Sequence, residues 1–288
     1  MWYRLSVGID EREMSIVDRN KPVEYMHGVG DAEQRRLEVQ AELLGGAAFL
    51  PTLRPNMTVL EVGCGPGAMA RRVARQIAPG EYVGVDREAR YLETAGRAAA
   101  ADRLTNTRFV RGDAERLEEL DLGGPFDGAY CRFVLEHTPA PVVVIRQLAE
   151  QVRPGGWICA YEWQNASFVV HPECPTVRRV WSGIDRLQET LEGDCNVAPK
   201  LLGMFQEAGL ADVRIRADAF AFTNQDDRLR RYVDGAREII GQTRASLLER
   251  DLVGESELAQ ADGEYAALLD NRAAVVVEVM CCATGVVG

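Results

Sequence analysis

The sequence predicts a doubly wound α/β fold, in which helices cover both faces of a mostly parallel sheet. First, the apolar run at residues 58–62 breaks into a glycine-rich turn at 63–67 and continues as a helical pattern at 68–77. Second, further short apolar runs follow at residues 81–86, 107–111, 126–131 and 157–162. Third, each of these runs ends in polar residues. Strands that alternate with helical segments indicate a parallel sheet, and such sheets bind their ligands at the carboxyl ends of the strands.

Two more strands complete a predicted sheet of seven. Residues 212–222 alternate polar and apolar side chains, and residues 273–282 are largely apolar. Some fifty residues separate these two strands, far too many for a hairpin loop. Helical patterns are expected at 32–44, 142–152, 177–191 and 200–208. We therefore expect three parts. Residues 1–48 form an N-terminal helical cap, and residues 49–222 with 273–288 form the core. Residues 223–272 form a helical insert that covers the substrate site.

The glycine-rich turn favours a nucleotide ligand. Gly63, Gly65 and Gly67 remove side chains where the backbone must turn sharply, and the following helix offers free N–H groups. Their G-x-G-x-G spacing is one residue shorter than the dinucleotide fingerprint. Glu61, just before the turn, would repel a pyrophosphate and suits a ligand with positive charge, such as an ammonium or a sulfonium. Taken alone, the turn is also compatible with a plain tight turn in an α/β domain.

Acids at the ends of the next two strands point to the same kind of ligand. Asp86 lies 19 positions after Gly67 (86 − 67), close to the ~20-residue offset of a carboxylate that binds ribose hydroxyls. Asp113 follows the third strand. The structural alternative for either acid is a cap on the next helix.

Together, these segments resemble the class I S-adenosylmethionine-dependent methyltransferases. The matching segments are VLEVGCGPG at 59–67, GVD at 84–86, GDAE at 112–115, FDGAYCRFVLEH at 126–137 and RPGGW at 153–157. YMHG at 25–28 and RLEVQ at 36–40 are similar to the bacterial small-molecule branch of that family. The resemblance implies a Rossmann-like fold, S-adenosylmethionine as cofactor, and methyl transfer to an O, N or C nucleophile. It also implies a small-molecule acceptor, with a secondary metabolite or a quinone-like compound as the expected class.

The resemblance further implies cofactor contacts, residue by residue. Glu61 is expected to meet the ammonium of the methionine part, Asp86 the ribose hydroxyls, and Asp113 with the Ala114 backbone the adenine. The remaining expected cofactor-binding residues are Gly63 and Gly65 in the turn, Cys131 through its carbonyl, Tyr25 and Gln40 at the carboxylate end, Arg87, and Arg132, for which an anionic substrate is the alternative.

His137 and Glu162 are the candidate catalytic residues. His137 follows the fourth strand, and a histidine titrates near neutral pH, which suits a general base. Glu162 ends the fifth strand, where the acceptor is expected. The alternatives are that His137 only packs its loop or contacts the cofactor, and that Glu162 caps a helix or bonds to a neighbouring loop. Aromatic residues nearby are either a wall of the substrate site or plain core, at Trp163, Phe168 and Trp181.

Composition argues against several classes of partner. The 288-residue chain has a net charge of −11, whereas nucleic acids and anionic membranes require a basic surface. No apolar run reaches the ~18 residues of a membrane span, and the N-terminal residues lack the apolar stretch of a secretion signal. The seven cysteines form no CxxC pair, so we expect a reducing cytoplasm and no metal site. A homodimer is possible.

Two other functions remain open from the sequence. One is a protein that binds S-adenosylmethionine without transferring its methyl group, as a regulator or a cyclase. The other is a nicotinamide-dependent oxidoreductase, against which Glu61, the glycine spacing and the Asp113 motif argue. An RNA or protein methyltransferase is disfavoured by the acidic charge and by a cap that restricts access.

Overall fold

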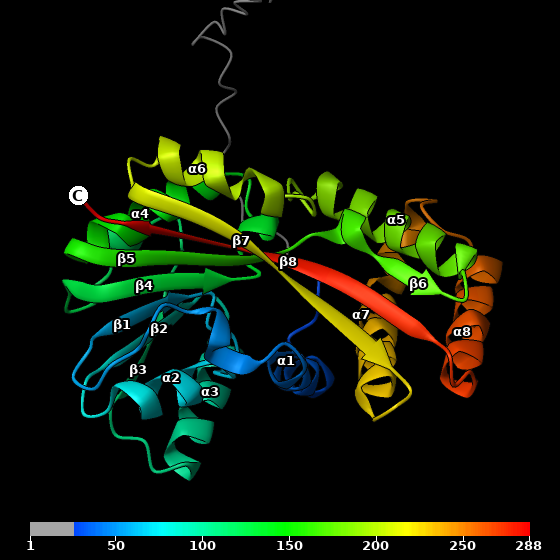
Figure 1. Cartoon of the computed structure of the whole chain (residues 1–288), viewed down its shortest axis with the longest axis horizontal. Helices are drawn as coiled ribbons and strands as arrows, with labels where there is room; N and C mark the ends of the chain where they lie inside the picture. Colours follow the sequence, from blue (N-terminus) through cyan, green and yellow to red (C-terminus); the bar gives the residue numbers. More distant parts are fainter. Residues whose placement is uncertain (1–25) are drawn as a thin grey trace, which may run out of the picture.

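The computed structural model describes residues 26–288, and Figure 1 shows their arrangement. The strands are β1 (Val59–Val62), β2 (Tyr82–Asp86), β3 (Thr107–Arg111), β4 (Phe126–Arg132), β5 (Val152–Trp163), β6 (Val169–His171), β7 (Ala211–Thr223) and β8 (Val275–Val286). The α-helices are α1 (Asp31–Leu43), α2 (Ala70–Ile77), α3 (Ala89–Ala101), α4 (Pro141–Gln151), α5 (Pro175–Thr190), α6 (Leu201–Glu207), α7 (Arg228–Glu249) and α8 (Glu255–Asp270). Short 3-10 helices are η1 (Gly46–Phe49), η2 (Leu117–Glu119), η3 (Leu135–His137), η4 (Asn165–Ser167) and η5 (Ala198–Lys200).

Five strands form the parallel half of the sheet, in the order β3-β2-β1-β4-β5. The direction of winding changes between β1 and β4, which is where doubly wound folds bind their ligands. Helices α2 and α3 cover one face of these strands, and α4 and α6 cover the opposite face (Figure 1). Because both faces are covered, β1 and β2 are buried along their whole length, and their sequences are near-continuous apolar runs. The predicted doubly wound fold is confirmed.

The antiparallel strand β8 runs past the end of the strand that it pairs with. Its residues 280–286 pair with β5, so that Met280 lies opposite Trp163, the last residue of β5. Residues 275–277 lie beyond this edge and pair with the short strand β6. Strand β7 pairs with β8 almost throughout, and the two strands extend together beyond the parallel strands (Figure 1). The described sheet therefore has eight strands rather than seven, because β6 is too short to leave a pattern of its own.

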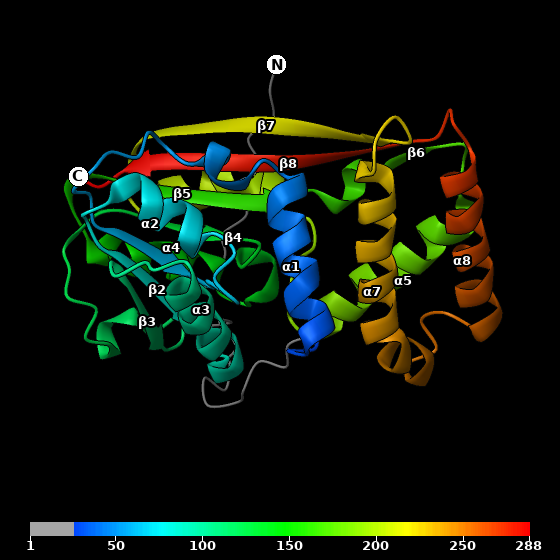
Figure 2. The same cartoon turned by 90° about the horizontal axis from the view of Figure 1, so that it is seen from below.

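Helices α7 and α8 fill the connection between β7 and β8. Both helices pack against α5, and α7 also packs against α1, as Figure 2 shows from below the sheet. The residues of α7 and α8 in this packing are completely or almost completely buried, at Leu229, Val233, Leu247, Tyr265 and Leu268. They join one hydrophobic cluster with α5 and the sheet. The segment between the last two strands therefore contributes to the core of the protein.

Most predicted elements are found close to their expected places. The third strand has the predicted bounds, and the helix predicted at 142–152 is displaced by one residue. Strand β5 begins five residues early (157 − 152), and β8 ends four residues late (286 − 282). Pairing with neighbouring strands sets where these strands begin and end, and the local sequence does not reveal that pairing. None of the helices between residues 26 and 288 is long and apolar enough to cross a membrane.

Gly183 of α5 tests the packing of the insert. A Cβ at Gly183 would lie 2.4 Å from Val253 Cγ2 and 3.4 Å from the Leu252 carbonyl oxygen. We expect Gly183→Ala to lower the free energy of unfolding by about 1 kcal/mol in urea denaturation, since overpacking outweighs the gain in helix propensity. Gly241→Ala in α7 is the matched control, because nothing lies within 4 Å of its added Cβ. An equal loss in both variants would contradict this packing.

Candidate functional site

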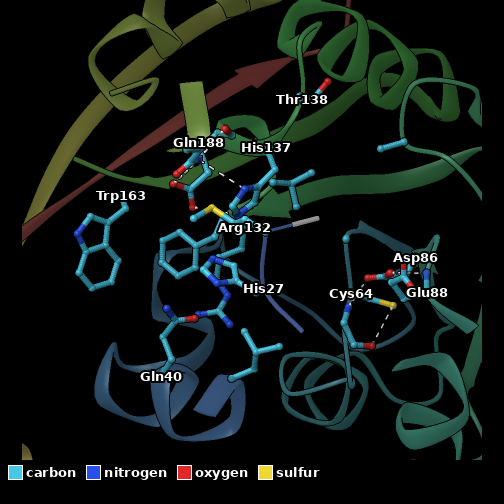
Figure 3. A pocket seen from close by; sticks show the side chains of 18 of the residues that line it. His27, Gln40, Cys64, Asp86, Glu88, Arg132, His137, Thr138, Trp163 and Gln188 are labelled. Carbon is cyan, nitrogen blue, oxygen red and sulfur yellow. Dashed lines mark hydrogen bonds and ion pairs between the residues drawn. The ribbon is translucent and has the colours of Figure 1, made fainter. Parts of the chain in front are cut away.

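A cavity of about 2240 Å³ lies at the carboxyl edge of the parallel strands. It is larger than the ~300–1,000 Å³ of a typical pocket for one small ligand, so it has room for two. One part of its wall comes from the loops after β1, β2 and β3, and the other part comes from α1, α5, α7 and β8. Figure 3 shows Cys64 and Asp86 on one side of this space, and Trp163, His137 and Gln188 on the other.

The glycine turn after β1 presents its backbone to the cavity. Gly63 and Gly65 line the cavity and have φ of 66° and 52°, a region that residues with side chains rarely adopt. A Cβ on Gly63 would lie only 2.3 Å from Val134 Cγ2, in the turn after β4. Glycine at this position therefore allows the turns after β1 and β4 to approach each other beside the cavity.

Asp86 is held in one orientation at the end of β2. One carboxylate oxygen accepts a hydrogen bond from the Gly65 N–H (2.8 Å) and the other from the Glu88 N–H (2.9 Å). Burial raises the pKa of Asp86, and the remaining lone pairs are available to a ligand. Asp113, Ala114 and Arg87, which were predicted to bind the same cofactor, also line the cavity.

Glu61 lines the cavity from β1 and is almost completely buried. Its Oε2 accepts hydrogen bonds from the hydroxyls of Tyr130 (2.6 Å) and Tyr82. Burial raises the pKa of Glu61 to about 7, although both hydrogen bonds act in the opposite direction. No hydrogen bond from residues 26–288 reaches Oε1, so this oxygen is available to a cationic group.

Arg132 and Gln40 also line the cavity. The Arg132 guanidinium lies 4.9 Å from the centroid of the Phe133 ring and forms no ion pair within residues 26–288. Burial lowers the pKa of Arg132, while the charge of Glu61 acts to raise it. Gln40 Oε1 is buried without a hydrogen-bond partner in the same part of the chain. A buried acceptor left unsatisfied at a cavity indicates a ligand donor that is not part of the protein, or an amide placed the other way round.

Two predicted cofactor contacts are not placed in the cavity by the structure. Cys131 is completely buried within β4 and is not among the residues that line the cavity, whereas the next residue, Arg132, is. The geometry therefore does not support the predicted contact of its carbonyl. Tyr25 lies outside the described residues.

The prediction that Glu162 is a catalytic base is not supported, because its side chain is completely buried and lines no part of the cavity. Its Oε1 accepts hydrogen bonds from the N–H groups of Val134 (3.1 Å) and Leu135 (3.0 Å). Burial, with a further contribution from Glu136, raises the pKa of Glu162 to about 8, so the carboxyl group is largely protonated at pH 7. Glu162 therefore positions the turn after β4 and does not reach an acceptor.

That turn contains an unusual backbone conformation. Phe133 has φ of 56°, which costs free energy for a residue with a side chain. Its N–H donates to the Tyr161 carbonyl oxygen (2.9 Å), and its ring lies 5.7 Å from that of Trp163. Phe133 also lines the cavity. These contacts, with Glu162 behind them, keep the turn in a conformation that its local sequence would not favour.

His137 lines the cavity just after this turn. Figure 3 shows His27 between Gln40 and His137, and the two imidazole rings are 5.8 Å apart and nearly perpendicular. Gln188 Nε2 lies 3.5 Å from His137 Nδ1, and Glu136 Oε1 lies 3.6 Å from Nε2. Burial lowers the pKa of His137 well below 6.5, and that of His27 to about 3. Both rings are therefore neutral at pH 7, and a neutral imidazole can accept a proton.

The far part of the cavity is what we call the aromatic chamber, lined by Trp163, Phe168, Trp181, Asp185, Tyr232 and Glu278. All three aromatic residues that the sequence left open between wall and core line the cavity. Sequence reasoning missed the polar residues of the chamber. Glu278 accepts hydrogen bonds from the Tyr232 hydroxyl (2.6 Å) and the Trp163 Nε1–H (3.0 Å). The signal that could have revealed it is a charged residue inside the apolar run 273–282.

Two arginines of α7 are paired with acids. Arg231 lines the cavity but forms an ion pair with Glu42, and Arg237 pairs with Asp262 (2.6 Å). Within residues 26–288, no group of three or more His, Cys, Asp and Glu side chains is placed to hold a metal ion.

The cavity fits S-adenosylmethionine at its polar end. Gly63 leaves the backbone accessible, Asp86 offers an oriented carboxylate, and Glu61 has an oxygen available to an ammonium. The unsatisfied Gln40 oxygen lies in the same cavity. These groups together suit a nucleoside that carries a charged amino acid.

Comparison with known proteins gives the same result. Residues 59–156 match a family model described as a methyltransferase domain. Over this third of its length, the chain is therefore similar to a methyltransferase domain. S-adenosylmethionine is its cofactor, as the sequence predicted.

Similar proteins carry methyltransferase names. A ubiquinone biosynthesis O-methyltransferase of Albidiferax ferrireducens is 36% identical over 100 residues, which cover 35% of this chain and 38% of that protein. Methyltransferase str3 of Strobilurus tenacellus is 28% identical, over 65% of this chain and 66% of that protein. The chain is also similar to the structure of a putative methyltransferase of Bacillus halodurans, with a TM-score of 0.54 and 16% identity. That match covers 88% of this chain and 98% of the other. This last similarity is one of fold. The chain spans about two fifths of the ubiquinone-pathway relative.

The buried position of Glu162 predicts a pH dependence of stability. The pKa of Glu162 is about 8 in the folded protein against a usual value of 4.5. The stability that protonated Glu162 contributes is therefore fully present below pH 4.5, falls as the pH rises, and is lost above about pH 8. We expect the free energy of unfolding to fall by about 1 kcal/mol between pH 7 and 8. Glu162→Gln keeps an acceptor for the turn and should show a smaller fall in denaturant titrations. The same fall in both proteins would contradict a buried, protonated Glu162.

Proposed function

We propose that this chain transfers the methyl group of S-adenosylmethionine to a small-molecule acceptor by in-line displacement. The observation that carries this proposal is the single cavity, which joins the glycine turn and Asp86 to the aromatic chamber. Displacement requires the nucleophile ~3–3.5 Å from the methyl carbon. Cofactor and acceptor must therefore share one space from which water is excluded, and the cavity is large enough for both.

Residues of the polar end bind and orient the cofactor. S-adenosylmethionine, when bound, supplies a methyl group that its positive sulfur makes electrophilic. Asp86 accepts from the ribose hydroxyls, Glu61 meets the ammonium, and Asp113 with the Ala114 backbone meets the adenine. The other contacts are the backbone surface at Gly63 and Gly65, Gln40 and Arg132 at the carboxylate end, and Arg87 beside Asp86.

His137 is the proposed proton acceptor. It lines the cavity as a neutral imidazole, directly after the turn that separates the two parts of the wall. Its lowered pKa makes it a weak base, which suits an acceptor that already loses its proton easily at the moment of transfer. Glu162 acts through the turn and touches neither ligand. The remaining rate enhancement comes from the orientation of cofactor and acceptor toward each other.

The helices around the chamber limit the acceptor to a small molecule. We propose that the predicted helical cap (residues 1–48), through its described helix α1, and the insert (residues 223–272) cover the core (residues 49–222 and 273–288), because α1 and α7 pack against each other beside the cavity. The net charge of −11 disfavours nucleic acid as a partner. The seven cysteines are free, which suits a cytoplasmic enzyme. A secondary metabolite as acceptor and a homodimer remain proposals from the sequence.

Loss of the ribose contact tests both the cofactor site and the reaction. Asp86→Ala should weaken S-adenosylhomocysteine binding by about 10- to 100-fold in calorimetry, since hydrogen bonds to a charged group are lost. It should also abolish transfer of labelled methyl groups to a fraction of small metabolites. The matched control is Asp121→Ala, which removes an exposed acid outside the cavity. Unchanged affinity in Asp86→Ala would overturn the assignment, and wild-type protein that binds the cofactor but labels no metabolite would count against transfer.

His137→Gln tests the proposed proton acceptor. Removing a general base should lower kcat by about 10²–10⁴-fold while the affinity for S-adenosylhomocysteine changes little. His171→Gln alters an exposed histidine of β6 outside the cavity and should behave as wild type. Steady-state kinetics with the labelled acceptor provide the measurement. A His137→Gln enzyme with wild-type kcat has no general base at this position.

A further inference from the structure

Resting on the function proposed above, we infer that the aromatic chamber selects an acceptor with a protonated amine next to an apolar body, in which the ammonium is a binding group and another atom is the nucleophile. Three features of the chamber support this substrate class: its aromatic residues, its carboxyl groups, and the placement of the nearby arginines. Each feature favours a positively charged ligand, and none is needed for binding the cofactor.

Two indole rings line the chamber with their polar edges already occupied. The Trp163 Nε1–H donates to Glu278 (3.0 Å), and the Trp181 Nε1–H donates to the Tyr265 hydroxyl (2.9 Å). Both indoles also line the cavity, and an ammonium over a tryptophan face is attracted by the ring quadrupole. The Phe168 ring already has the Arg178 guanidinium 5.4 Å from its centroid, so the indoles are the better faces for a ligand cation.

Two carboxyl groups of the chamber have only neutral hydrogen-bond donors within residues 26–288. Glu278 accepts from Tyr232 and Trp163, and Asp185 accepts from the Asn165 amide (2.9 Å). Burial raises the pKa of Glu278 to about 7, with a smaller contribution from Asp185. Burial also raises the pKa of Asp185. The ionised forms of the two groups repel each other.

Arginines on the cavity wall near the chamber are matched by other acids. Arg36 forms an ion pair with the buried Glu33 (2.6 Å), and Arg231 forms one with Glu42. Arg132 is attracted by Glu61 rather than by Glu278 or Asp185. Within the described part of the cavity wall, the chamber thus has carboxyl groups that no protein cation neutralises.

A ligand ammonium would neutralise the charge of these carboxylates. A buried carboxylate without a cation is costly, and an amine guest supplies the charge together with charge-assisted hydrogen bonds. An alcohol of the same shape offers only neutral hydrogen bonds, and a carboxylate guest is repelled. The chamber should therefore discriminate by charge between ligands of equal size.

Calorimetry on the full chain saturated with S-adenosylhomocysteine tests this inference. The probes are benzylamine, 2-phenylethylamine and tryptamine, each compared with the alcohol and the carboxylate of the same skeleton. For at least one skeleton, we expect the amine to bind about tenfold or more tightly than its alcohol. Titration at pH 6.5 in two buffers of different ionisation enthalpy should show proton release, because the amine favours the ionised carboxyl groups.

Two variants assign the preference to the chamber. Glu278→Gln and Asp185→Asn should each reduce the ratio of amine to alcohol affinity, and Asp185→Asn is the milder change because it keeps an acceptor for Asn165. Glu249→Gln, an exposed acid of α7 outside the cavity, should leave the ratio unchanged. S-adenosylhomocysteine affinity is measured for each variant and should stay at the wild-type value, which verifies the fold.

The inference is overturned if alcohols or carboxylates bind as tightly as the amines on every skeleton, or if none of the amines binds. It is also overturned if neither chamber variant changes the amine preference. Failure of the wild-type protein to bind S-adenosylhomocysteine would instead contradict the proposed function. The two failures are therefore distinguishable in the same titrations.

Discussion

The architecture depends on one pairing, between β5 and a β8 that is shifted along it. Because Met280 lies opposite the last residue of β5, the first residues of β8 extend beyond the edge at which doubly wound sheets bind ligands. This extension pairs with β6 and β7, and α5, α7 and α8 pack beside it. It also carries Glu278 into the aromatic chamber. A single antiparallel strand thus connects the cofactor-binding core to the second half of the cavity.

The turn after β4 is the place where the two halves of the cavity meet. It approaches the glycine turn so closely that Gly63 has no room for a side chain beside Val134. The buried Glu162 holds the same turn from behind, through two backbone N–H groups. Phe133 and His137 are presented to the cavity from it. Because these contacts converge on five residues, a small displacement of the turn would alter cofactor and acceptor positions together.

Carboxyl groups in and around the cavity share a chemical environment but differ in role. Burial raises the pKa of Glu61, Glu162 and Glu278 toward or above neutrality, since a low dielectric disfavours the charged form. Glu162 is bonded to backbone donors and fixes a turn. Glu61 and Glu278 are bonded to side-chain hydroxyl or indole groups and border the cavity. What each group can do follows from which of its oxygens remain accessible.

The sequence by itself determined the parallel core and the polar end of the cavity. Glycines, strands buried on both faces and acids at strand ends are local signals, because the backbone conformation and the period of burial act within a few residues. Only the tertiary structure decided that Glu162 faces the turn after β4, that Cys131 stays within the sheet, and that Trp163 contacts Glu278. These outcomes depend on which strands pair and how far β8 extends. Glu162 lies 28 positions from Val134, and Trp163 lies 115 positions from Glu278, so no local pattern encodes these contacts.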